Sequence, residues 1–560
     1  MDKETGGEWG DVVCLRVPHA RAAKGVARKE QSMRPRLWQP PVALSAEEAA
    51  IVRRIHRAKL FIFLRLQRHV LFTPAFQEEL ATALYAQKPK GHPPIPPAQL
   101  ALAALLQAYT GVSDDEVIEA TTMDRRWQLA LDCLDCTEPP FSKATLIAFR
   151  QRLIAHDGDR RLIERTLEVA KEYGAFSPKA LRVALDSSPL WGAGKVEDTF
   201  NLVGHALRTA LSVLARQQGR ELADVAAAAG AAPVIGSPRS VKAVLDLDWD
   251  DPEARTAGLE QVVAALDAVD QWLGAQPAAA TEPAVQASRA AAHQVWAQDV
   301  ERNVDGRPAL RHGVSRDRRI SIEDAQMRHG RKSRSVRVDG YKRHVVQDLD
   351  SGLICAVGIT AANAAEASVT DALDIDLQAN HLGLADLAEL HLDRGYLSSR
   401  WVRERPATLA VYCKAWPVRN GSRFAKTAFA LDWAQQRIRC PAQVELPFTP
   451  GGTVHFPAAL CTACTLRERC TSSVHGRSVS IHPDEHFLAE LRARQHTPAG
   501  RAKLRERVAV EHTLAHVGHW QGRRARYRGQ RKNLFDLRRC AVVDNLHIVS
   551  HLLLTTKKAA

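Results

Sequence analysis

Three acidic side chains occupy positions from which they could serve one reaction. Asp186 ends the alternating apolar stretch 181–186, and Asp393 directly follows the apolar stretch 387–392, so each carboxylate is expected at the end of a strand. Glu511 lies on the flank of a predicted helix. Hard divalent cations prefer oxygen ligands, and two of them about 3.5–4 Å apart can hold the attacking and leaving oxygens of a phosphodiester. The acids therefore predict a catalytic site that uses Mg²⁺ (or Mn²⁺).

The elements that carry these acids leave two interpretations open. Ligands of open α/β sheets gather beyond the carboxyl ends of the strands, which is where Asp186 and Asp393 are expected. Alternatively, both aspartates belong to ordinary turns, and Arg507 and Glu511 form a surface ion pair one helical turn apart. Spacing alone does not decide between a metal site and this plainer arrangement.

Four cysteines form a second constellation between the second and third acids. A C-x-x-C pair and two further cysteines lie within about thirty residues, a set that could supply a tetrahedral thiolate site for structural Zn²⁺: Cys440, Cys461, Cys464 and Cys470. The outer spacings are irregular, so ordinary reduced thiols are the alternative. Either interpretation predicts an insertion domain.

Positive charge is concentrated in two segments. Residues 301–345 contain 13 Lys and Arg against 6 Asp and Glu, and residues 501–540 contain 12 against 3, whereas the whole chain has a net charge of +14. Such clustering predicts binding to a polyanion, most simply nucleic acid, and the alternative is a solvated charged face. The predicted phosphate-binding side chains are Lys332, Arg334, Lys342, Arg343, Arg507, Arg523, Arg524, Arg526 and Arg528.

The elements that must position these residues divide the chain of 560 residues. Helical spacing, proline pairs and strand patterns predict a basic, weakly ordered arm (1–45), a helical domain that is a candidate for DNA binding (46–175), an α/β domain (176–550) and a tail (551–560). The α/β domain is predicted to contain a helical insertion at about 204–300 and a cysteine-containing insertion at about 414–500. The predicted fold class is α/β, with several domains.

Composition excludes some classes of protein. Hydrophobic residues make up 45% of the chain and charged residues 25%, as expected of a globular protein with real cores. We find no run of eighteen apolar residues and no secretory signal, so we expect a soluble cytoplasmic protein, associated with the nucleoid if it binds DNA, without a membrane partner.

Four stretches, taken in order, resemble one protein family. They are LDSSPLWGAGKVEDTFNLV (185–203), RHGRKSRSVRVDGYKRHV (328–345), LDRGYLSS (392–399) and RERVAVEHTLAHVGHWQGRRARYRGQRKN (505–533), together with the helical segment from about 65 to 155. With these motifs the chain resembles DDE-type transposases of bacterial insertion sequences. In that family a helical N-terminal domain precedes a ribonuclease-H-like catalytic core.

The resemblance implies a function. It places the family's three acids on Asp186, Asp393 and Glu511, with Mg²⁺ (or Mn²⁺) as cofactor, for DNA strand cleavage followed by strand transfer. The implied partner is double-stranded DNA, both the terminal inverted repeats of the element and the target, bound by a homodimer. Related transposases often carry Tyr-x-x-Arg-x-x-x-Glu-x-x-x-x-x-x-Lys around the third acid, whereas Leu504 and Gly518 stand at its Tyr and Lys positions here.

Two rival functions share these features. A ribonuclease-H-like nuclease without joining activity would need the same acids. A catalytically decayed transposase that only binds DNA would keep the basic segments without needing the acids.

Overall fold

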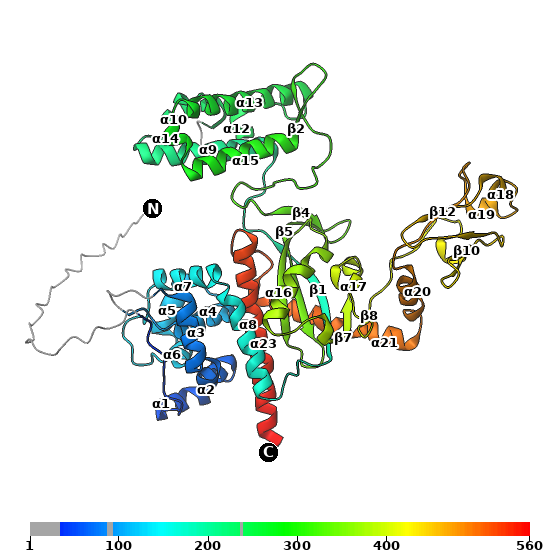
Figure 1. The fold of residues 1–560 in the computed structure, drawn as a ribbon. Helices are drawn as coiled ribbons and strands as arrows, with labels where there is room; N and C mark the ends of the chain where they lie inside the picture. The colour runs from blue at the N-terminus through cyan, green and yellow to red at the C-terminus, as the bar shows by residue number, and fades with distance from the viewer. Residues whose placement is uncertain (1–33, 87–92, 236–238, 560) are drawn as a thin grey trace, which may run out of the picture.

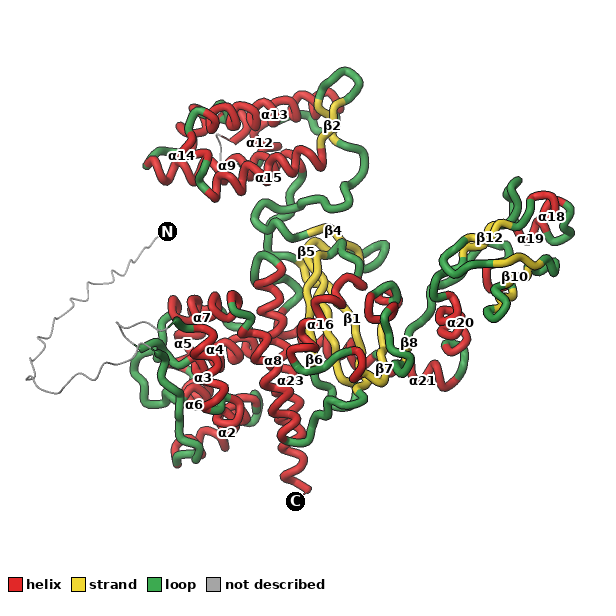
Figure 2. Tube along the Cα trace, viewed as in Figure 1, coloured by secondary structure: helices red, strands yellow, loops and turns green. Residues whose placement is uncertain are grey.

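The computed structural model describes residues 34–86, 93–235 and 239–559. Most of the arm predicted at 1–45 lies outside these residues. The remainder forms a central body from which two smaller lobes project, as Figure 1 shows. Figure 2 distinguishes the helical parts of the molecule from the parts built on strands. In the described residues no helix is both long and apolar enough to cross a lipid bilayer.

The first part of the body is helical, as predicted for 46–175. Ser45 and Ser113 each cap a helix through a reciprocal bond with the glutamate three residues later. The central helix of this part is buried on nearly all sides and ends at Gly111, whose φ of +75° suits glycine. The helices are α1 (Ala46–Arg54), α2 (Leu60–Leu71), α3 (Pro74–Leu84), α4 (Pro97–Thr110), α5 (Asp114–Met123), α6 (Arg125–Leu131), α7 (Lys143–Ala155) and α8 (Gly158–Glu172).

A mixed six-stranded sheet forms the second part of the body. Its strands are β1 (Leu181–Trp191), β4 (Arg328–Arg331), β5 (Arg337–Asp348), β6 (Ile354–Ala361), β7 (Leu387–Leu392) and β8 (Ala410–Tyr412). β5 is antiparallel to β1, β4 and β6, whereas β7 is parallel to β1 and β8 to β7. β1, β6, β7 and β8 therefore run in one direction, and their carboxyl ends meet at one edge of the sheet.

Helices cover the sheet. α16 (Thr370–Ala379) and α23 (Gln530–Ala559) contact β6, and α22 (Val508–Gln521) contacts β1 and β5. α23 also contacts α4 and α8, so it joins the helical part to the sheet. The segment predicted as a tail at 551–560 is helical as far as Ala559, because α23 continues through it.

One strand differs from its prediction. β1 does not end at Asp186 but continues to Trp191, because residues 187–191 keep pairing with residues 340–344 of β5. The short strand predicted before Asp393 is confirmed by β7.

The two lobes have cores of their own. The first is the predicted helical insertion, with α9 (Thr199–Gln218), α10 (Leu222–Ala228), α11 (Ala232–Ile235), α12 (Val241–Leu245), α13 (Pro252–Gly274), α14 (Pro277–Ala280), α15 (Pro283–Asp299), β2 (Val300–Arg302) and β3 (Pro308–Leu310). The second contains β9 (Ala430–Asp432), β10 (Arg437–Arg439), β11 (Glu445–Pro447), β12 (Thr453–His455), α18 (Ala458–Thr462), α19 (Arg467–Cys470) and β13 (Ser478–Ser480). α20 (Glu485–Arg494) and α21 (Pro498–Glu506) lead from this lobe back to α22.

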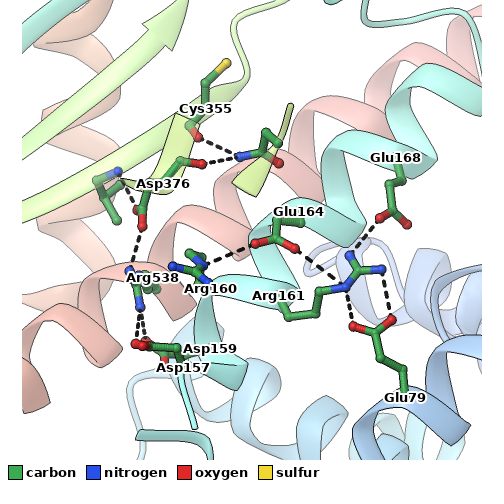
Figure 3. Close-up of polar contacts among 12 residues, drawn as sticks. Glu79, Asp157, Asp159, Arg160, Arg161, Glu164, Glu168, Cys355, Asp376 and Arg538 are labelled. Atoms are coloured by element: carbon green, nitrogen blue, oxygen red, sulfur yellow. Dashed lines mark hydrogen bonds and ion pairs between the residues drawn. The ribbon is translucent and has the colours of Figure 1, made fainter. Parts of the chain in front are cut away.

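A buried ion-pair network joins the helical part to the sheet part. Arg538 of α23 donates from Nη2 to Asp376 of α16 at 2.6 Å and from Nη1 to Asp159 of α8 at 3.1 Å, as Figure 3 shows. The side chains of Arg538, Asp376 and Asp159 are 5%, 2% and 0% exposed. Removing one member of this network would leave an unpaired charge in the protein interior. The network therefore fixes the positions of α8 and α16 relative to α23.

Candidate active site

Asp186 and Asp393 are neighbours at the edge of the sheet. β1 and β7 pair in parallel as far as Leu185 and Leu392. Asp186 is the next residue of β1, and Asp393 directly follows the end of β7. Adjacent strands lie about 4.8 Å apart, so this register brings the two acids close together. The Ser187 amide donates to Asp186 Oδ1 at 2.8 Å and helps to fix that carboxylate.

Glu511 reaches the same place from helix α22. The apolar stripe predicted for this helix is confirmed by the burial of Val510, Leu514 and Val517. Glu511 lies beside the stripe with a side chain 49% exposed. Arg507 links two of the acids, because Nη1 donates to Asp186 and Nη2 donates to Glu511 Oε1 at 2.6 Å. The Arg507–Glu511 pair of the plainer interpretation is therefore present, and it belongs to the rim of this site.

All three acids line one open cleft of about 1350 Å³. Its walls also carry the basic side chains of Arg331, Lys332, Lys342, Arg343, Arg507 and Arg523. The cleft thus carries these three carboxylates, whose oxygens do not all lie within 4.8 Å of one another, together with six basic side chains. Such an arrangement can hold a divalent cation at the acids and phosphates of a polyanion on either side.

The electrostatics of Asp186 show that negative charge is crowded here. Burial raises the pKa of Asp186, the charges of Asp393 and Glu511 raise it further, and the Arg507 guanidinium and the Ser187 amide oppose the rise. A carboxyl group whose pKa is raised by like charges gains from any cation that comes near. The donors are all carboxylate oxygens, which suits Mg²⁺ or Mn²⁺ better than zinc.

Glu366 is a further acid of the cleft that the sequence did not point to. It begins the turn of 3₁₀ helix η1 (Glu366–Val369) after β6 and lines the cleft with the other acids. Ser187 Oγ donates to Glu366 Oε1 at 2.8 Å. Gly395 lies opposite it, and a Cβ at that position would displace the Glu366 carboxylate from its present place. The signal in the sequence was an acid shortly after a strand end, the feature that singled out Asp393.

The predicted phosphate-binding residues separate into two groups. Lys332, Lys342, Arg343, Arg507 and Arg523 line the cleft, whereas Arg334, Arg524, Arg526 and Arg528 are not among its lining residues. Of the second group, three contact other parts of the protein: Arg524 donates to the carbonyls of Gly192 and Ala193, Arg526 to those of Gly111 and Val112, and Arg528 pairs with Glu323.

Within the first group, most hydrogen-bond donors of Arg343 are already bound to protein atoms. Its side chain is buried and donates to Ser188 Oγ, Gln521 Oε1 and the carbonyls of Pro189 and Gly522. It therefore holds α22 against β1. Lys332 and Arg523, like the neighbouring Arg331, are exposed in the cleft and can meet phosphates.

A tighter acidic group lies elsewhere. In the described part of the chain, one group of three or more His, Cys, Asp and Glu side chains has all its ligand atoms within 4.8 Å of one another, and it consists of Glu389, His391 and Glu506. Arg182 and Lys503 both form ion pairs with Glu389 and Glu506. Two cations already neutralise the two carboxylates, so this group is a structural ion-pair network between β1, β7 and α21.

The four predicted zinc ligands lie in the second lobe. Cys440, Cys461, Cys464 and Cys470 line one cavity there, apart from the acidic cleft. They do not form one of the tight groups described above, so their sulfur atoms surround the cavity more loosely than bound ligands would.

Two family models match the chain. One, described as a transposase DDE domain, matches residues 448–549, which include Glu511 and three of the four cysteines. The other, described as a transposase domain (DUF772), matches residues 61–152 of the helical part. No curated protein and no solved structure matches the chain.

Proposed function

The chain belongs to the DDE-type transposases of insertion sequences, and from that premise we propose that it cleaves DNA strands and transfers them at the cleft of Asp186, Asp393 and Glu511. The observation that carries the proposal is the register of β1 and β7, which sets two aspartates side by side in a cleft that a third acid and several cations also line. The proposed core is ribonuclease-H-like. A sheet with an antiparallel pair of strands on one side of β1 and parallel strands on the other supports it.

In this proposal the three carboxylates hold Mg²⁺ or Mn²⁺. A bound ion would supply Lewis acidity to a nucleophilic water or DNA 3′-hydroxyl and would offset negative charge on the phosphate. Asp186 and Asp393 present ligands from the rigid sheet, and Glu511 presents one from the helix. Arg507 donates hydrogen bonds to Asp186 and Glu511. When the metal neutralises these carboxylates, the guanidinium group would be free to bind a DNA phosphate.

The proposed partners are DNA duplexes. The cleft would seat the terminal inverted repeat of the element and then the target, with Lys332 and Arg523 on the flanking phosphates. A homodimer would bring two element ends together. Residues 46–175, which contain the second family match, are the proposed additional DNA-binding part.

Replacing Lys332 and Arg523 together by alanine is expected to reduce the salt dependence of DNA binding. Each lost contact to duplex DNA lowers the slope of log affinity against log salt by about 0.9, so the double variant should lose about 1.8. Affinity should fall for specific and non-specific DNA alike, since phosphates carry no sequence. Fluorescence anisotropy titrations at several salt concentrations measure the slope.

The matched control for that experiment removes two exposed arginines of the helical insertion, Arg220 and Arg255. Their removal changes the net charge equally and should leave the slope within about 0.3 of the wild-type value, because neither lies in the cleft. Equal slopes for wild type and the Lys332, Arg523 double variant would show that the DNA follows another path.

Glu366→Gln is expected to lower the rate of cleavage by about 10- to 100-fold, the usual effect of losing a group that orients metal ligands. The substitution removes a negative charge and weakens the bond to Ser187, which is adjacent to Asp186. The Mg²⁺ concentration at half-maximal rate should rise as well, a change that loss of folded protein alone would not cause. Glu404→Gln, whose side chain is 61% exposed at the end of α17 (Arg400–Arg403), is the control. Unchanged Mg²⁺ dependence in Glu366→Gln would remove Glu366 from the site.

A further inference from the structure

The second lobe has a core too small to account for its order. Its strands have three residues each, paired in a three-stranded and a two-stranded sheet. Seven buried hydrophobic residues make up the core: Phe429, Ile438, Phe448, Val454, Phe456, Val479 and Ile481. Modules of this size usually need a disulfide or a structural metal to stay folded. The cysteines of the lobe are free, so no disulfide fills that role.

Four cysteines from three local structures meet around one cavity of this lobe. Cys440 begins the turn between β10 and β11, Cys461 lies in α18, Cys464 follows that helix, and Cys470 ends α19. All four are partly buried and line a cavity of about 50 Å³ whose remaining walls are mainly apolar. A space of this size accommodates a single ion, and its apolar walls would exclude competing water.

The surroundings suit a negatively charged metal–thiolate centre. Four thiolates around a divalent ion carry a net charge of about −2, and Arg467 and Arg477 line the same cavity. Nε of Arg477 is buried and has no hydrogen-bond acceptor, so this N–H group is available to a thiolate. The amide of Leu466 donates to Cys464 Sγ at 3.4 Å, a contact that stabilises a thiolate.

The four sulfur atoms are still too far apart to bind one ion without a change in their side chains. Zinc ligands in a tetrahedron lie about 2.3 Å from the ion and therefore about 3.8 Å from one another. Since no three of these sulfurs, all in the described part of the chain, lie within 4.8 Å, their side chains must turn inward on binding.

We propose that Cys440, Cys461, Cys464 and Cys470 bind one structural Zn²⁺, which holds the second lobe together with Arg467 and Arg477 as counter-charges. The site is independent of the acidic cleft, and it stabilises a fold without taking part in phosphodiester chemistry. Its full set of four protein ligands leaves no open position, as in structural zinc sites.

Metal analysis of the full-length protein, purified under reducing conditions without chelators, tests the proposal. We expect about one zinc per chain in the wild type and less than about 0.2 in Cys464→Ser. Cys136→Ser, which changes an exposed cysteine of the helical part, should keep the full zinc content. Wild-type protein refilled with Co²⁺ should show the thiolate-to-cobalt absorption of a tetrahedral centre.

Limited proteolysis then locates the effect. Cleavage within residues 424–481 should become at least about tenfold faster in Cys464→Ser, while cleavage of the central body stays unchanged. Wild-type protein with no stoichiometric zinc, or with iron in its place, would overturn the proposal. So would a zinc content that Cys464→Ser leaves intact. If Cys464→Ser does not fold, the zinc content and Co²⁺ spectrum of the wild type decide the matter.

Discussion

Asp393→Asn is expected to reduce Mg²⁺-dependent DNA cleavage by at least about 10³-fold while changing DNA affinity less than about threefold. An amide is a neutral, weaker ligand, so the site loses both a metal ligand and the charge that favours the ion. The magnitude follows from the cost of removing one group that stabilises transition-state charge, about 10²–10³, with weaker metal binding in addition. Single-turnover cleavage of labelled DNA at saturating Mg²⁺ measures the effect.

Asp267→Asn is the matched control, because Asp267 is an exposed acid of α13 in the helical insertion. The same change of charge there should leave the cleavage rate within about twofold of wild type. A rate for Asp393→Asn within about tenfold of wild type would remove Asp393 from the catalytic site. Loss of DNA binding in the same variant would indicate damage to the fold instead.

Arg538→Ala is expected to lower the free energy of unfolding of the central body by about 3–5 kcal/mol, the cost of removing one partner from a buried ion pair. Asp376 would lose the guanidinium with which it pairs, whereas Asp159 would keep its ion pair with Arg531. Burial already raises the pKa of Asp376 against the pull of Arg538, so its charge would be poorly tolerated alone. Hydrogen exchange of amides in α8, α16 and α23 measures the loss locally, which suits a chain of several domains.

Arg161→Ala provides the comparison within the same region. Arg161 pairs with Glu79 and Glu168, and these three side chains are 24–46% exposed; its third partner, Glu164, lies farther away at 3.5 Å. Partly exposed pairs of this kind contribute about 0–1 kcal/mol. Exchange rates in α8 should therefore change by less than about tenfold in Arg161→Ala and by far more in Arg538→Ala. Equal effects of the two substitutions would show that the buried Arg538 network stabilises the fold no more than the exposed Arg161 pairs do.

Local patterns were enough to predict the strand before Asp393 and the helix that carries Glu511. Both elements have apolar periodicity that is complete within a few residues. The strand is found as predicted, whereas the long helix predicted to begin near Arg501 is divided at Arg507 into α21 and α22. The end of β1 could not be predicted in this way. Residues 187–191 contain two serines and a proline, and they stay in the strand only because β5, more than 140 residues away, pairs with them.

The roles of individual arginines were also beyond local patterns. The charge counts singled out two segments, and some of their basic residues line the cleft. The guanidinium groups of Arg343 and Arg524, however, donate to protein atoms of distant segments. Glu366 shows the opposite case. It carries no motif of its own, and it lines the cleft because β6 runs in the same direction as β1 and ends at the same edge.

We propose that the acidic cleft both cuts DNA and joins it. The most direct measurement incubates the purified protein and Mg²⁺ with labelled DNA carrying the terminal inverted repeats found beside the gene, together with a target plasmid, and counts joined products. We expect joined products that require Mg²⁺ and disappear in Asp393→Asn. Cleavage without any joined product would identify a nuclease instead, and joining that persists in Asp393→Asn would contradict the assignment of the site.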